Sequence, residues 1–114
     1  MASASQLDAL SKIIAARKGA DADKSYSARL LAKGLETCAR KFGEEAVETL
    51  VAAMSRDKQA AVSESADMLY HWLVLLAALD IDPADVYAEL ARREAQSGLA
   101  EKASRNSERG PEHE

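Results

Sequence analysis

Several residue types that other classes of protein rely on are scarce in this chain of 114 residues. Its single cysteine, Cys38, excludes an internal disulfide framework and lies at helical spacing among apolar residues, so we interpret it as core filler. Aromatic residues make up only 4%, and there are 5 glycines and 2 prolines. Residues that favour strands are therefore rare, whereas alanine and leucine, which favour helix, dominate. This composition predicts an all-α fold.

The chain also lacks a basic block, a long apolar run and a recognisable leader. Its net charge is -4 and its pI is near 5.2, which is not the electrostatic footprint of a nucleic-acid-binding protein. The longest apolar stretch, residues 69–79, carries His71 and is too short to span a bilayer. The opening MASASQLDAL has neither the basic start nor the apolar run of a signal peptide. We expect a cytoplasmic protein with no nucleic-acid or membrane partner.

Apolar periodicity predicts four main helices joined by short connections, as in a helical bundle. Asp57 is expected to cap the third, and Asp82-Pro83 to open the fourth. The expected helices cover residues 6–17, 35–55, 58–79 and 82–96, with a short helical turn at 26–32. Residues 1–96 would then form one helical domain, and the polar segment 97–114 a disordered tail.

Acidic residues concentrate in two segments, KFGEEAVETL and SESADMLYH. The first segment carries Glu44, Glu45 and Glu48, and the second carries Glu64 and Asp67. Residues three or four apart share one face of a helix. Two helices joined by a short turn pack antiparallel, so the two sets of carboxylates are expected to face each other. Such acids can also form an ordinary solvated surface, which is what charge runs usually do.

Charge pairing favours a metal site over that alternative. Glu48, Glu64 and Asp67 have no lysine or arginine three or four residues away. Converging carboxylates repel one another unless a cation lies among them. Oxygen ligands suit Mg²⁺, with Mn²⁺ or Ca²⁺ as alternatives, rather than zinc, and Mg²⁺ leaves positions open for substrate phosphates. His71, four residues after Asp67, is expected to hydrogen-bond an acid rather than bind the metal.

The motif E-E-x-x-E followed by E-x-x-D resembles the MazG-like all-α nucleotide pyrophosphohydrolase superfamily. Within it, RKGADADKSYSARLLAKG, KFGEEAVETLVAA and ESADMLYHWLVLLA resemble conserved segments of the phosphoribosyl-ATP pyrophosphohydrolase family. The resemblance covers about Leu7 to Arg93, with Ser27 where the family pattern has threonine. It implies Mg²⁺-assisted hydrolysis of phosphoribosyl-ATP to phosphoribosyl-AMP and pyrophosphate, the second step of histidine biosynthesis, by water attack at the α-phosphorus.

The same resemblance implies roles for individual residues. Four acids would bind metal: Glu45, Glu48, Glu64 and Asp67. Glu44 and Glu45 would be the catalytic acids, with Glu44 either holding a second Mg²⁺ or orienting the attacking water. The residues available to bind substrate are the cations Arg17, Lys18, Lys24 and Lys41 and the hydroxyls of Ser25 and Tyr26. Arg17 and Lys18 also suit an ordinary helix C-terminus.

Two other functions stay open from the sequence alone. A house-cleaning nucleoside triphosphate pyrophosphohydrolase would have the same metal site and a different base pocket. A non-enzymatic helical interaction module would carry the acids as surface charge.

The expected bundle is completed by dimerisation. The segment 72–78 is apolar on all sides, and a soluble helix of that kind must be covered on all sides. A domain this small has few other helices that could cover this segment. We therefore expect a homodimer or a larger even-numbered assembly.

Overall fold

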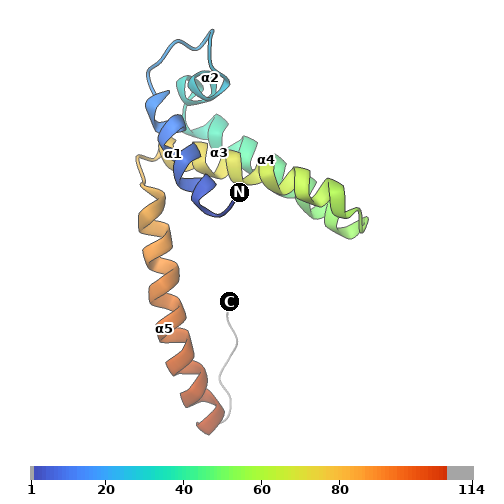
Figure 1. The fold of residues 1–114 in the computed structure, drawn as a ribbon, viewed down its shortest axis with the longest axis vertical. Helices are drawn as coiled ribbons and strands as arrows, with labels where there is room; N and C mark the ends of the chain where they lie inside the picture. The colour runs from blue at the N-terminus through green and yellow to red at the C-terminus, as the bar shows by residue number, and fades with distance from the viewer. Residues whose placement is uncertain (1, 108–114) are drawn as a thin grey trace. The chain divides into compact units, whose positions relative to one another are not determined.

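The computed structural model of the chain describes residues 2–107, which contain five helices and no strand (Figure 1). This confirms the all-α fold. The chain divides into two compact units, Met1–Pro83 and Ala84–Glu114. The helices are α1 (Ser5–Ala16), α2 (Tyr26–Lys33), α3 (Leu35–Met54), α4 (Lys58–Ala78) and α5 (Pro83–Ser107).

Local sequence signals determine where these helices begin and end. The Asp57 carboxylate accepts a hydrogen bond from the Ala60 backbone N–H at 3.0 Å, which confirms the predicted cap of α4. Gly34, with φ of 101°, separates α2 from α3 in a conformation that residues with a Cβ rarely adopt. Arg56 follows α3 with a φ of 59°, so the chain reverses within a short turn.

The turn after α3 makes α3 and α4 an antiparallel hairpin, and Figure 1 shows the two helices side by side along most of their length. Helices α1 and α2 pack against one end of this hairpin. The core of the first unit lies there and is formed by Ile14, Leu30, Cys38, Leu73 and Val74. The Cys38 thiol donates a hydrogen bond to the Leu30 carbonyl, and burial raises its pKa, so this thiol is core filler as predicted.

Helix α5 is longer than the sequence pattern predicts. It continues to Ser107 instead of ending near residue 96, so residues 97–107 are helical and not the disordered segment that we expected. Alanine, leucine, glutamate and lysine in this stretch favour helix, and the single Gly98 costs only about 1 kcal/mol relative to alanine. The rest of the predicted tail, residues 108–114, lies outside the described residues.

The exposed apolar surface lies elsewhere than predicted. Leu73, Val74 and Leu76 on α4 are buried within the single chain, because α1 and α2 cover this part of the hairpin. A set of exposed apolar side chains lies instead on α3, at one-face spacing. We call this set the α3 apolar face: Val47, Leu50, Val51 and Met54, between 56% and 75% exposed.

Among the described helices, none is long and apolar enough to cross a membrane.

Candidate active site

The antiparallel hairpin brings three of the predicted acids together. Glu45 and Glu48 lie one turn apart on α3, and Glu64 lies on α4. Each offers a carboxylate oxygen, and these oxygens all lie within 4.8 Å of one another. The convergence that the sequence predicted for these three residues is therefore present in the fold.

The cluster has the properties of a hard-cation site. One carboxylate oxygen of Glu45 and one of Glu64 are buried and have no hydrogen-bond partner among the described residues. Burial, followed by a hydrogen bond with Glu48, raises the pKa of Glu64. Two oxygens bound to one Mg²⁺ lie at most about 4.2 Å apart, because each Mg–O distance is about 2.1 Å. The three carboxylates thus fit Mg²⁺ or Mn²⁺ after small side-chain movements.

Asp67 lies at the edge of this cluster rather than inside it. Its side chain is exposed, and its oxygens are not part of the group within 4.8 Å. It lies one turn along α4 from Glu64, and its negative charge contributes to the raised pKa of Glu64. It is thus close enough to act on the cluster electrostatically.

His71 is a buried ring on α4, one turn after Asp67. Tyr26 and Tyr70 meet it edge-on, with ring centroids 6.0 Å and 5.0 Å away. Burial is the largest cause that lowers the His71 pKa. Its Nδ1 has no hydrogen-bond partner among the described residues, so the expected bond to an acid is not formed at that nitrogen.

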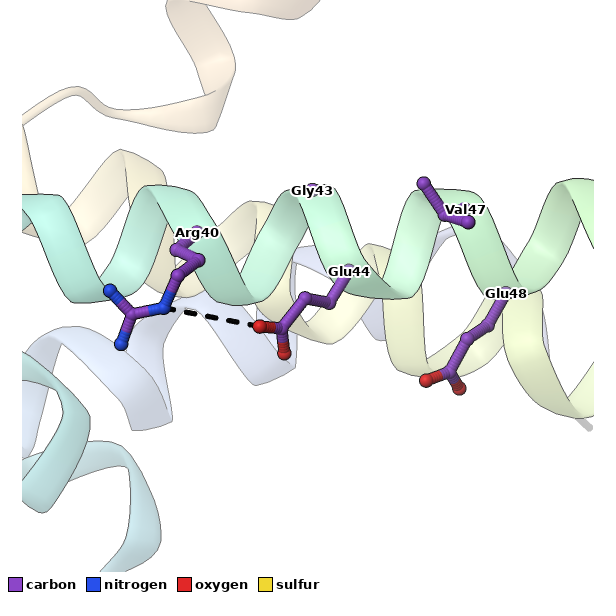
Figure 2. Close-up of a pocket in the computed structure, with 5 residues that line it drawn as sticks. All are labelled: Arg40, Gly43, Glu44, Val47 and Glu48. Carbon is purple, nitrogen blue, oxygen red and sulfur yellow. Dashed lines mark ion pairs between the residues drawn. The ribbon is translucent and has the colours of Figure 1, made fainter.

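Glu44 belongs to a different environment on the same helix. Lys41 Nζ lies 3.3 Å and Arg40 Nε 3.9 Å from its carboxylate oxygens. Figure 2 shows Arg40, Glu44 and Glu48 projecting from one side of α3. Together with Gly43 and Val47 they line an open hollow of about 630 Å³. The lining of this hollow thus includes one cation, Arg40, two carboxylates, of which Glu48 belongs to the acid cluster, and one residue of the α3 apolar face.

Two of the predicted substrate-binding residues, Lys41 and Tyr26, lie on α3 and at the start of α2. Tyr26, the first residue of α2, stacks on Tyr70 with ring centroids 6.1 Å apart. The hydrogen bond to Glu44, and then the nearby Tyr26, raise the pKa of Lys41. Lys41 is therefore held next to Glu44 on α3, and Tyr26 lies at the start of α2. The Ser25 hydroxyl accepts a hydrogen bond from Ala28 N–H at 3.1 Å, so its first role is to cap α2.

The other predicted cations, on or beside the loop between α1 and α2, come earlier in the chain. Lys18 Nζ donates to Asp80 at 2.6 Å and to the Ala77 carbonyl at 3.0 Å, at the C-terminal end of α4. Ala77 is 13 residues beyond Glu64 on that helix, which corresponds to about 20 Å. Arg17 and Lys24 are exposed at the two ends of the loop that joins α1 and α2.

Sequence reasoning missed two residues of the site. Arg40 is four residues before Glu44, a spacing typical of helical ion pairs, so the sequence did contain this signal. Thr49 donates hydrogen bonds to two backbone carbonyls of the acid cluster, on α3 and on α4. No local pattern could have indicated the second contact, because it depends on how the two helices are aligned.

The chain is similar to a well-defined group of proteins. The sequence pattern of the family described as phosphoribosyl-ATP pyrophosphohydrolase matches residues 7–94. A phosphoribosyl-ATP pyrophosphatase of Parvibaculum lavamentivorans is 69% identical over 104 residues, which cover 91% of this chain and 95% of the relative. Proteins of the same name are 59% identical in Ruegeria pomeroyi, over 84% of this chain and 91% of the relative, and in Dinoroseobacter shibae, over 89% and 99%.

Proposed function

We propose that this chain, which belongs to the phosphoribosyl-ATP pyrophosphohydrolase family, hydrolyses phosphoribosyl-ATP to phosphoribosyl-AMP and pyrophosphate, a step of histidine biosynthesis. The structural observation that carries the proposal is the convergence of Glu45, Glu48 and Glu64 with two buried, unpartnered carboxylate oxygens. A nucleotide substrate of this kind is consistent with a reaction in the cytoplasm.

We propose that Glu45, Glu48 and Glu64 hold Mg²⁺ or Mn²⁺, with Asp67 completing the set. The bound cation would neutralise negative charge on the phosphate oxygens as the pyrophosphate leaves. The contribution of the acids is to hold this cation at one point on the α3–α4 hairpin. Their mutual repulsion in the metal-free protein favours cation binding.

In the proposed reaction, the oxygen of a water molecule forms a bond to the α-phosphorus and loses a proton, which passes to the orienting carboxylate and then to solvent. The bond between that phosphorus and the oxygen bridging to the β-phosphorus breaks, and pyrophosphate leaves with the bonding electrons. Glu45 or Glu44 accepts a hydrogen bond from the attacking water and orients it. Glu44 has a second possible role in holding another Mg²⁺, and its ion pairs with Lys41 and Arg40 keep it beside the hollow for either role.

The substrate phosphates are proposed to bind in the hollow beside the cluster, where Arg40 supplies positive charge. Lys41, which is ion-paired with Glu44 of the hollow, is proposed to assist. Tyr26, the first residue of α2, is proposed to contact the substrate as well. Arg17 and Lys24 remain candidates for the outer part of the substrate. Lys18 is the weakest candidate within one chain, since it is engaged about 20 Å from Glu64 along α4.

The decisive experiment incubates the purified chain with phosphoribosyl-ATP and measures pyrophosphate release with and without Mg²⁺. We expect release that depends on Mg²⁺ and is lost in Glu64→Gln. The same assay with ATP and the other free nucleoside triphosphates tests the house-cleaning alternative, for which we expect little hydrolysis. Mg²⁺-independent release, or none, would contradict the proposal.

We also propose that the active form is a homodimer or a larger even-numbered assembly that buries the α3 apolar face. Its four side chains remain mostly exposed in the single chain, and Val62 on the adjoining α4 is 72% exposed. Contiguous apolar patches on soluble proteins usually mark interaction surfaces. A second copy with two-fold symmetry covers such a face most simply.

A further inference from the structure

Thr49 makes an unusual contact between the two helices that carry the acids. Its hydroxyl is 2.9 Å from the Glu45 carbonyl oxygen, one turn earlier on α3. Threonine commonly makes this local bond within a helix. The same hydroxyl is also 3.0 Å from the Glu64 carbonyl oxygen on α4, 15 residues away in the sequence. Both acceptors are carbonyls, so the single hydroxyl proton is shared between them.

The two carbonyls belong to residues whose side chains converge in the cluster. Glu45 and Glu64 are also the residues with a buried, unpartnered carboxylate oxygen. Without a cation, their charges and that of Glu48 repel one another, and this repulsion acts to separate α3 from α4 at this level. The Thr49 bridge opposes the separation at the same turn of the helix.

We infer that Thr49 is a positioning residue for the metal cluster, whose hydroxyl holds the backbones of Glu45 and Glu64 at the separation that the cation requires. This inference rests on the proposed function, because it takes the cluster to be a magnesium site. Thr49 touches neither the cation nor the substrate in this role. It acts through the two acids, as residues in the outer shell of metal sites do.

The test compares Thr49→Val, which removes the hydroxyl and keeps the branched shape, with Thr49→Ser, which keeps the hydroxyl. Mg²⁺ affinity is measured by calorimetry on the substrate-free protein. Loss of an outer-shell partner typically weakens metal affinity 10- to 100-fold, and we expect roughly tenfold for Thr49→Val. Thr49→Ser should bind Mg²⁺ as the wild type does. Thr37→Val, the same change elsewhere on α3, is the matched control and should also leave affinity unchanged.

Kinetics provide the second readout. For Thr49→Val the KM for Mg²⁺ should rise about as much as the dissociation constant, while kcat at saturating Mg²⁺ changes far less. A role limited to packing would lower the melting temperature without this separation. Thermal unfolding of the metal-free variants is measured alongside to make the comparison.

The outcomes are distinguishable. If Thr49→Val binds Mg²⁺ like the wild type, or Thr49→Ser loses affinity equally, the positioning role is refuted. If Thr49→Val does not fold, Thr49→Ala replaces it, and failure of both to fold would show a structural role instead and also refute the inference. If the wild type itself neither binds Mg²⁺ nor releases pyrophosphate, the proposed function fails first.

Discussion

Replacing Leu50 with alanine tests whether the α3 apolar face is the subunit interface. Leu50 lies in the middle of that face and is 62% exposed in the single chain. A partner subunit that covers the face would bury this remaining surface, and in a two-fold assembly both copies of Leu50 would be buried. Leu50→Ala should therefore weaken the assembly while leaving each subunit folded.

The size of the effect follows from the exposed fraction. Full burial of a leucine side chain is worth about 1.5–3 kcal/mol. With 62% of the side chain still to be buried, and with alanine retaining one carbon, we use the lower end, about 1 kcal/mol per copy. Two copies give about 2 kcal/mol per dimer, or a roughly 30-fold weaker dissociation constant.

Sedimentation equilibrium over a range of concentrations measures this constant. Ile13→Ala is the matched control, because Ile13 is 51% exposed on α1 and outside the α3 apolar face. We expect Ile13→Ala to leave the dissociation constant unchanged. An unchanged constant in Leu50→Ala would refute the interface, and a stable, active wild type at the mass of one 12.2 kDa chain would refute the assembly.

Three further predictions concern the acids and Lys18. Glu48→Gln and Glu64→Gln should each abolish turnover and leave the fold intact; near wild-type activity at saturating Mg²⁺ in either variant would exclude it from the site. Burial and Glu48 raise the pKa of Glu64 above its ordinary value of 4.5, so the charged carboxylate destabilises the folded, metal-free protein. The free energy of unfolding should therefore increase as the pH falls through the raised pKa, and the increase should be complete below about pH 4.5. Urea unfolding across this pH range should show a smaller increase in the free energy of unfolding for Glu64→Gln than for the wild type. The lowered pKa of His71 has the opposite effect in both proteins, so it cancels when the two are compared. Lys18→Ala should lower the free energy of unfolding by about 0.5–1 kcal/mol, as expected for a surface ion pair with Asp80, and should leave calorimetric Mg²⁺ affinity unchanged.

The acid cluster was predictable because it depends on local geometry and one short turn. Spacing of three residues places Glu45 next to Glu48 on α3, and the cap at Asp57 marks where α4 begins. An antiparallel hairpin then leaves little freedom in where Glu64 can lie. Spacing alone grouped Asp67 with these three acids, whereas in the fold its oxygens lie outside the 4.8 Å group, so its role as a metal ligand stays a prediction.

Features that depend on distant contacts were not predictable in this way. Lys18 looked like a free cation after α1, but its partner Asp80 is 62 residues away in the sequence. The apolar segment 72–78 looked uncovered, but α1 and α2 pack on the end of the hairpin that contains it. Hydropathy along one helix indicates that a surface must be covered, and only the packing of other helices shows whether the same chain covers it.

The position of Val47 connects the proposed assembly with the proposed chemistry. Val47 belongs to the α3 apolar face, and it also lines the hollow that contains Glu44 and Glu48 (Figure 2). A subunit that packs on this face must therefore approach the rim of the hollow. It would limit the access of water and increase the effect of each charge on the substrate, since electrostatic interactions strengthen as water is excluded. We accordingly expect activity to fall together with the dimer fraction when the enzyme is diluted, and Leu50→Ala to shift that fall to higher protein concentration. Activity per chain that stays constant across the dissociation range would show that each subunit works alone.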